Sequence, residues 1–256
     1  MRAERVYKTE AIVLKRLDLG EADKIVTAYT PYLGKIRAVA KGVRRPTSKM
    51  GGHLEPFTHS RLLVAAGRNL DIITQAETIH SFRELREDLF RLSHACYLME
   101  LLDGFTEERL ENRPLFELLL EVLGLLTTAK DLQLLMRYYE VKLLEHLGYR
   151  PQLRSCVSCG RALKPRVNVF SPALGGVLCV DCRLKDLSAP DLSLDGLKVL
   201  RFLQDNPYPG ARRLRLGPAV QAEIQTLLGG YLRYLLERDL KSTEFLRTLR
   251  RQGVAP

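Results

Sequence analysis

The spacing of apolar residues changes once along the 256-residue chain, close to residue 80. Before this point, apolar and polar residues alternate in short runs, which is typical of half-buried β-strands. Beyond it, apolar residues recur every three or four positions, which is typical of amphipathic helices. The pattern therefore predicts an N-terminal β-region followed by a mainly helical region.

The β-region contains five short runs that are separated by turn residues and show no helical pattern. The predicted strands cover residues 5–17, 21–30, 35–43, 53–66 and 70–78. Gly20 and Gly34 lie at two of the turns, where glycine adopts a positive φ at little cost. Five consecutive strands predict a small closed or partly open barrel, and the five-stranded oligonucleotide-binding (OB) barrel matches best in strand number.

The region after residue 80 is predicted to be helical except for one segment rich in cysteine. Helical patterns cover 82–102, 115–127, 131–147, 196–204 and 218–235, whereas the basic tail from residue 242 onward is expected to fray. We interpret the chain as a multi-domain α+β protein. Its predicted parts are an OB barrel at 1–80, a helical bundle at 81–148, an inserted four-cysteine module at 149–187, and C-terminal helices at 188–256 that pack on the bundle.

Charge divides the chain into basic, acidic and basic segments. Residues 1–80 carry 14 Lys/Arg against 8 Asp/Glu, residues 81–148 carry 8 against 13, and residues 149–256 carry 18 against 9. Basic ends suit a nucleic acid or an acidic peptide. A membrane surface fits less well because no strongly amphipathic basic helix stands out.

The most basic stretch follows the predicted third strand. Ile36, Ala38 and Ala40 alternate there with Lys35, Arg37, Val39 and Lys41, which predicts a half-buried strand with a basic open face. A loop rich in Gly, Pro and Ser continues the stretch without any acidic residue. Long cations on such a loop suit a polyanion backbone, and the alternative is a solvated hairpin tip. The candidate DNA contacts are Lys35, Arg37, Lys41, Arg44, Arg45 and Lys49.

Four of the five cysteines form two CxxC pairs, which are Cys156 with Cys159 and Cys179 with Cys182. Each pair turns two thiolates toward one point, and four thiolates complete a tetrahedral zinc site with no position left for water. The pattern therefore predicts a structural Zn²⁺. The alternatives are two disulfides or a redox pair, which the absence of a secretion signal disfavours.

Two features near the cysteines leave their roles open. His146 lies ten residues before Cys156 and is a competing ligand, although a histidine at a helix end is more often packed or capping. A group of cations surrounds the first CxxC pair and either contacts DNA or balances the charge of the thiolates. These cations are Arg150, Arg154, Arg161, Lys164 and Arg166.

Neither a targeting segment nor an enzyme signature is visible. The N-terminus lacks the apolar core of a signal peptide, and Glu117 and Glu121 interrupt the longest apolar stretch, so we expect a cytoplasmic protein without a membrane span. No Asp/Glu cluster with His, phosphate-binding loop or Ser/His/Asp grouping stands out, which argues against catalysis. The remaining alternative is a zinc-ribbon regulator that reads a specific sequence, although no recognition helix is evident.

Four sequence strings resemble those of the bacterial RecO family of recombination and repair proteins. They are EADKIVTAYT at 21–30, GKIRAVAKGVRRPTS at 34–48, LEPF at 54–57, and a Gly-Arg-x-Leu turn at 67–70 that leads into a strand ending in Ala-Glu. The predicted order of barrel, bundle, four-cysteine module and further helices fits the same family. One departure is Thr47, where many members carry a further cation.

The resemblance implies a nucleoid-associated protein that binds single- and double-stranded DNA and anneals complementary strands, including strands coated by single-strand binding protein (SSB). It implies partnership with RecR and with the acidic C-terminal tail of SSB, help in loading RecA, and no bond-making activity. It also places the DNA contacts at the six cations named above and a metal at the four cysteines. Arg212, Arg213 and Arg215 are a possible rim for the SSB tail.

The barrel offers few side chains on which bases could stack. The aromatic residues available are Tyr7, Tyr29, Tyr32 and Phe57, and the chain contains no tryptophan. We therefore expect weak stacking and a strong dependence of DNA binding on salt.

Overall fold

The computed structural model describes residues 6–251, which form two compact units. Unit 1 holds the described residues up to Thr128 together with the last helix from Ser242, and unit 2 holds Ala129–Lys241. The chain therefore leaves unit 1 after Thr128 and re-enters it at Ser242. The finer division into four parts stays a prediction.

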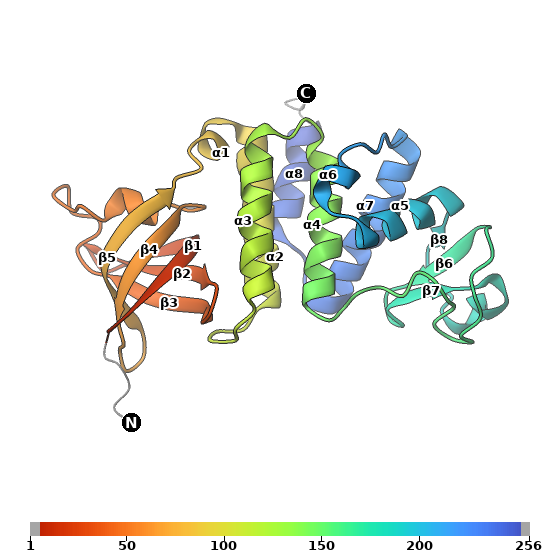
Figure 1. The fold of residues 1–256 in the computed structure, drawn as a ribbon, viewed down its shortest axis with the longest axis horizontal. Helices are drawn as coiled ribbons and strands as arrows, with labels where there is room; N and C mark the ends of the chain where they lie inside the picture. The colour runs from red at the N-terminus through yellow and green to blue at the C-terminus, as the bar shows by residue number, and fades with distance from the viewer. Residues whose placement is uncertain (1–5, 252–256) are drawn as a thin grey trace. The chain divides into compact units, whose positions relative to one another are not determined.

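Unit 1 begins with the predicted barrel, which confirms the fold class. Its strands are β1 (Val6–Leu19), β2 (Asp23–Thr30), β3 (Gly34–Ala40), β4 (His59–Ala65) and β5 (Asp71–His80). They pair in the order β1-β2-β3-β5-β4, and β4 pairs with β1 to close the barrel (Figure 1). Only β3 and β5 run parallel. Alternate residues such as Val26, Ala38 and Val64 fill the interior.

The fourth strand starts later than its sequence pattern predicts. Residues 51–54 form a short 3₁₀ helix, η1 (Gly51–Leu54), and β4 begins at His59. Leu54 is fully buried in the barrel core, and Arg16 of β1 holds Glu55 through two hydrogen bonds of 2.8 and 2.6 Å. The segment thus contributes Leu54 to the barrel core and does not extend β4.

Four helices complete unit 1. They are α1 (Glu84–Glu87), α2 (Leu89–Phe105), α3 (Arg113–Thr128) and α8 (Lys241–Arg251). The expectation of a frayed tail is wrong for 242–251, which are helical. The backbone N–H of Ser242 donates to Glu100 of α2 at 2.8 Å, and the Ser242 hydroxyl donates to the same carboxylate. The last five residues of the expected tail lie outside the described residues.

Unit 2 combines helices with a small sheet. Its elements are α4 (Leu132–His146), β6 (Asn168–Ser171), β7 (Gly176–Leu178), η2 (Val180–Lys185), β8 (Asp191–Leu192), α5 (Leu194–Asp205), α6 (Tyr208–Ala211) and α7 (Pro218–Leu236). The sheet order is β7-β6-β8, and α4 packs with both α5 and α7. Tyr231 of α7 meets Phe170 of β6 edge-on, with ring centroids 5.4 Å apart. Within residues 6–251, every helix is too short or too polar to cross a membrane.

Candidate nucleic-acid interface and metal centre

The basic loop, which we define as residues 41–50, is held firmly against the barrel. Val43 is buried in the barrel core. The backbone N–H of Gly42 donates to Asp23 at 2.7 Å, and that of Arg44 donates to the carbonyl of Ala22 at 2.9 Å. The loop is thus fixed to the turn between β1 and β2, while its longer side chains point outward.

The cations of this region differ in their partners. Lys41, Arg45 and Lys49 are exposed, and within 6–251 none of the three has a side-chain hydrogen bond or an ion pair. Arg44 lies 3.4 Å from the carboxylate of Asp18. Arg37 lies on the open face of β3, 3.5 Å from the carboxylate of Glu108. Three cations are therefore immediately available to an anion, and two are shared with weakly held carboxylates.

Lys35 differs from the prediction of a solvent-facing cation. Its side chain is only 11 % exposed, and its ammonium donates to the carbonyl of Asp103 at 2.7 Å and to the carboxylate at 3.1 Å. Asp103 lies in α2 and also binds Lys15 of β1. Burial raises the pKa of Asp103, but the hydrogen bonds from Lys15 and Lys35 outweigh it and place that pKa below its usual range. Lys35 thus ties the barrel to α2.

We expect Asp103→Asn to lower the free energy of unfolding by about 3 kcal/mol at pH 7, because it leaves the Lys35 ammonium buried without its counter-charge. The folded pKa of Asp103 is depressed, so its stabilising effect is complete above the unfolded pKa and is lost as the pH falls through the folded pKa. The difference between wild type and variant should therefore shrink below about pH 4. Urea unfolding at several pH values measures this.

Asp18→Asn is the matched control, because Asp18 pairs with Lys24 on the surface of the same barrel. Asp18→Asn should lower the free energy of unfolding far less than Asp103→Asn, because solvent screens a surface ion pair. Equal losses from Asp18→Asn and Asp103→Asn would contradict the assigned role of Asp103.

Only one of the four predicted stacking residues can reach a base. Tyr29 and Phe57 are buried, and the Tyr7 hydroxyl donates to Asp71 at 2.5 Å. Burial raises the pKa of Tyr7 and that of Tyr29 to about 12. Tyr32 is 57 % exposed, and the Arg113 guanidinium lies 5.5 Å from its ring centroid. Aromatic stacking is thus limited to this edge of the barrel.

The four predicted metal ligands converge in unit 2. The sulfur atoms of Cys156, Cys159, Cys179 and Cys182 all lie within 4.8 Å of one another, and those of Cys159 and Cys179 are 3.8 Å apart. Four ligands at the usual Zn–S length of about 2.3 Å would be separated by about 3.8 Å in a tetrahedron. All four cysteines are free thiols, and His146 is not part of the cluster. The group is positioned to bind a metal ion and fits zinc.

Neighbouring donors favour the thiolate form at the first pair. A hydrogen bond of 3.3 Å from the Arg161 guanidinium lowers the pKa of Cys159 to about 6. Burial raises the pKa of Cys156, but hydrogen bonds from backbone N–H groups, led by that of Cys179, outweigh it and lower the pKa. Burial raises the pKa of Cys182 to about 11. The first CxxC pair therefore offers the ionised sulfur that a metal requires.

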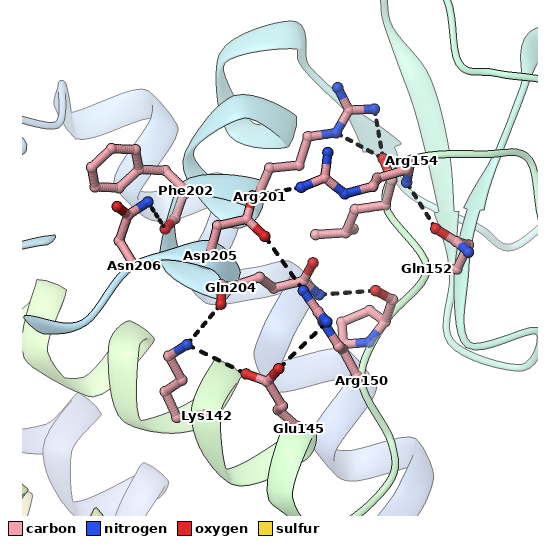
Figure 2. Close-up of polar contacts among 12 residues, drawn as sticks. Lys142, Glu145, Arg150, Gln152, Arg154, Arg201, Phe202, Gln204, Asp205 and Asn206 are labelled. Carbon is pink, nitrogen blue, oxygen red and sulfur yellow. Dashed lines mark hydrogen bonds and ion pairs between the residues drawn. The ribbon is translucent and has the colours of Figure 1, made fainter. Parts of the chain in front are cut away.

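A polar network holds the start of this module against α4 and α5 (Figure 2). Arg201 of α5 donates to the carbonyl of Leu153 at 2.8 and 2.6 Å, and Gln204 donates to the carbonyl of Pro151 at 2.9 Å. Lys142 of α4 donates to the carbonyl of Gln204 at 2.7 Å. The segment that leads into the first CxxC pair is thus fixed by side chains from two helices.

The same network includes some of the cations near the cysteines, whose role the sequence leaves open. Arg150 and Arg154 both bind the carboxylate of Asp205, as Figure 2 shows. Arg161 binds Asp181 as well as the sulfur of Cys159. Lys164 and Arg166 are exposed. Three of the five cations therefore organise the module itself.

Sequence reasoning missed the acidic partners of the cations. Asp103 and Glu108 lie in the acidic segment 81–148 and Asp205 lies in the basic segment that follows. These three carboxylates hold Lys35, Arg37 and Arg154, respectively. The partners are 51 to 71 positions apart along the chain, so no local pattern announces these pairs. Only the folded topology brings them together.

Comparison with known proteins agrees with this geometry. The family model "Recombination protein O N terminal" matches residues 1–82, and "Recombination protein O C terminal" matches residues 86–244. The DNA repair protein RecO of Roseiflexus sp. (strain RS-1) is 47 % identical over 96 % of this chain and 87 % of its own length. That of Symbiobacterium thermophilum is 41 % identical over 96 % of this chain and 98 % of its own. That of Dehalococcoides mccartyi strain 195 is 38 % identical, with coverage of 97 % and 98 %. The chain therefore belongs to the RecO family of DNA repair proteins.

Proposed function

We propose that this chain is a non-enzymatic mediator of DNA repair that binds single- and double-stranded DNA without sequence preference and anneals complementary strands. Membership of the RecO family supports the general role in repair. The basic loop supports the finer role, because it presents three unpaired cations from a backbone anchored on an OB barrel. Figure 1 shows the loop between β3 and η1.

The chemistry of the loop suits phosphate contact. Arginine and lysine side chains of this kind neutralise phosphates and release counterions, which gives binding without base reading. Annealing requires two polyanions to approach, and a neutralising surface lowers their repulsion. A regulator that reads a specific sequence would instead need a helix or ribbon aimed at base edges, and no observation favours one.

The proposed DNA contacts fall into two groups. Lys41, Arg45 and Lys49 make the primary contacts. Arg44 and Arg37 contribute by exchanging a surface carboxylate for a phosphate. Lys35 is not proposed as a DNA contact, because Asp103 holds its ammonium in a buried position.

We expect the triple variant Lys41→Gln, Arg45→Gln, Lys49→Gln to bind single-stranded DNA more weakly and with less dependence on salt. Each lost phosphate contact removes about 0.7 from the slope of log K against log [salt] for single strands, so the slope should fall by about 2. Annealing of complementary oligonucleotides should slow accordingly. Fluorescence anisotropy at a series of salt concentrations and a quenching assay for annealing measure the two effects.

The control is Lys130→Gln with Arg238→Gln, which removes two exposed cations outside the barrel. It should leave the slope and the annealing rate close to wild type. An unchanged slope in a folded triple variant would move the DNA site away from the basic loop. Failure of wild type to anneal any complementary pair would refute the proposed function itself.

We also propose that the four cysteines hold one structural Zn²⁺. The tetrahedral spacing of the sulfur atoms supports zinc, and four protein ligands leave no open position for substrate or water. The ion would join the two CxxC pairs, whose local core contains few large apolar residues.

We propose further that the protein binds RecR and the acidic tail of SSB, and through these partners helps to load RecA. Family membership supports these partners. Arg212, Arg213 and Arg215 are exposed after α6 and stay the proposed rim for the SSB tail.

A further inference from the structure

An apolar row follows the strand pairing around the outer surface of the barrel. Strand pairing places Leu17 opposite Ile25, Ile25 opposite Val39, and Val39 opposite Ile72. The row continues from Ile72 to Ala65 and from Ala65 to Val6. The apolar row therefore comprises Leu17, Ile25, Val39, Ile72, Ala65 and Val6.

The apolar row faces outward and is open to solvent. Directly paired residues lie on the same face of a sheet, and successive residues on one strand lie on opposite faces. The neighbours Val26, Ala38 and Ile73 are at most 2 % exposed and fill the interior. Leu17 is 54 % exposed and Val6 is 47 % exposed, while the four residues between them are half-buried. Exposure of an aliphatic strip to water is unfavourable, and a ligand that covers the strip removes this cost.

Cations border the strip on the strand where it is central. Arg37 stands two positions before Val39 on β3, which places it on the same face about 7 Å away, and Lys41 follows the end of this strand. At the β1 end, Leu19 is 40 % exposed and precedes Gly20, whose carbonyl accepts from Arg44 at 3.2 Å. The strip is thus continuous with the basic loop, in which no acidic residue occurs.

We propose that the apolar row contacts the faces of unpaired bases and thereby gives this protein a preference for single-stranded over double-stranded DNA. This inference rests on the proposed function. Arg37 and the basic loop hold the phosphates. The bases of the same DNA strand lie on Leu17, Ile25 and Val39. A duplex keeps its bases stacked inside and offers this strip nothing, whereas a single strand exposes them. The aliphatic surface takes the place of the aromatic residues that are buried in this barrel.

The absence of tryptophan from the chain allows a direct test. In the variant Leu17→Trp, the introduced indole is the only one in the protein and reports stacking through fluorescence quenching. We expect quenching by a single-stranded oligonucleotide and an affinity for it raised about tenfold, since stacking on an aromatic ring contributes about 1–3 kcal/mol per base. A duplex should give no quenching. Nor should an abasic oligonucleotide of equal length, which keeps the phosphates without the bases.

Two further variants complete the test. Tyr234→Trp places an indole on α7 at a residue of matched exposure, 53 %, and should show no quenching with any of these ligands. Leu17→Ser should weaken single-strand binding about fivefold and leave duplex binding unchanged, because only apolar contact is removed. The exposed position of Leu17 makes both variants compatible with a folded barrel.

The possible failures can be told apart. If wild type binds and anneals DNA but neither Leu17 variant changes single-strand binding, the apolar row does not contact bases and the proposed function stands. Equal quenching by the abasic oligonucleotide would also overturn the inference, because phosphate contact alone would explain it. If wild type binds no DNA, both proposals fall together.

Discussion

Replacing Cys179 with serine should release the bound metal and unfold the cysteine module while the barrel stays folded. Zinc binding contributes roughly 10–16 kcal/mol of apparent free energy in small zinc modules at pH 7. The local core offers little to replace it, since its fully packed members are the two cysteines Cys156 and Cys179 with Val169, Leu178 and Ala189. A three-ligand site should therefore lose both the ion and the fold of residues 155–185.

Two measurements check this expectation. Elemental analysis should find one zinc per wild-type chain and almost none in Cys179→Ser. Trypsin should then cleave rapidly after Arg166 and Arg183, which are exposed but lie in folded segments of the intact module. Chelation of wild type should reproduce the same cleavage.

The matched control is Cys96→Ser, because Cys96 lies in α2, outside the metal cluster. It should retain the metal and resist trypsin. The salt dependence of DNA binding should be unchanged in Cys179→Ser, because the basic loop belongs to unit 1. Full metal content or full protease resistance in Cys179→Ser would contradict a structural role for the ion.

Replacing Gly34 with alanine should cost about 4 kcal/mol of folding free energy, the second large effect we expect. Gly34 has a φ of +59°, and a Cβ there would lie 1.9 Å from the carbonyl oxygen of Leu110. Leu110 belongs to the loop between α2 and α3, which bonds to β3 through the N–H of Arg109 and the carbonyl of Lys35 at 2.9 Å. Because the clash is with backbone, the loop must move away from β3.

Gly20→Ala isolates the contribution of backbone conformation. Gly20 has a φ of +58°, almost the same as Gly34, but nothing lies within 4 Å of its added Cβ. Gly20→Ala should lower the free energy of unfolding by about 1 kcal/mol, the usual penalty for a residue other than glycine in the left-handed region. Urea unfolding followed by circular dichroism compares the two. Similar losses of stability in Gly34→Ala and Gly20→Ala would show that the close approach of Leu110 does not contribute to the cost at Gly34.

The parts of this protein that could be predicted from the sequence are those specified by nearby residues. The barrel strands follow from period-two alternation such as Ile36, Ala38 and Ala40, whose side chains are all buried. The cluster of four cysteines follows from two CxxC turns, each of which brings two sulfur atoms together. Because the information is local, the sequence alone predicts both features correctly.

The parts that could not be predicted depend on distant partners. The alternating pattern predicts that Lys35 lies on the open face of β3. The pattern does not show that Asp103, 68 positions away, binds the Lys35 ammonium. The sequence pattern assigns Leu54 to the fourth strand, because it does not show that this side chain leaves the strand and enters the barrel core. Likewise, the tail from residue 242 looks polar, and no local pattern shows that Ser242 bonds to Glu100 of α2 at the start of a helix.

The return of α8 to unit 1 has a consequence for how the chain is made. Ser242 and Glu100 are separated by 142 positions, and all of unit 2 lies between them. On the ribosome, the barrel and α2 emerge long before α8 exists, so unit 1 can acquire this helix only after all of unit 2 has been synthesised. The inserted unit can fold during that interval. Completion of unit 1 is therefore coupled to synthesis of unit 2, and a chain that stops within unit 2 would carry the barrel with α2 and α3 but without α8.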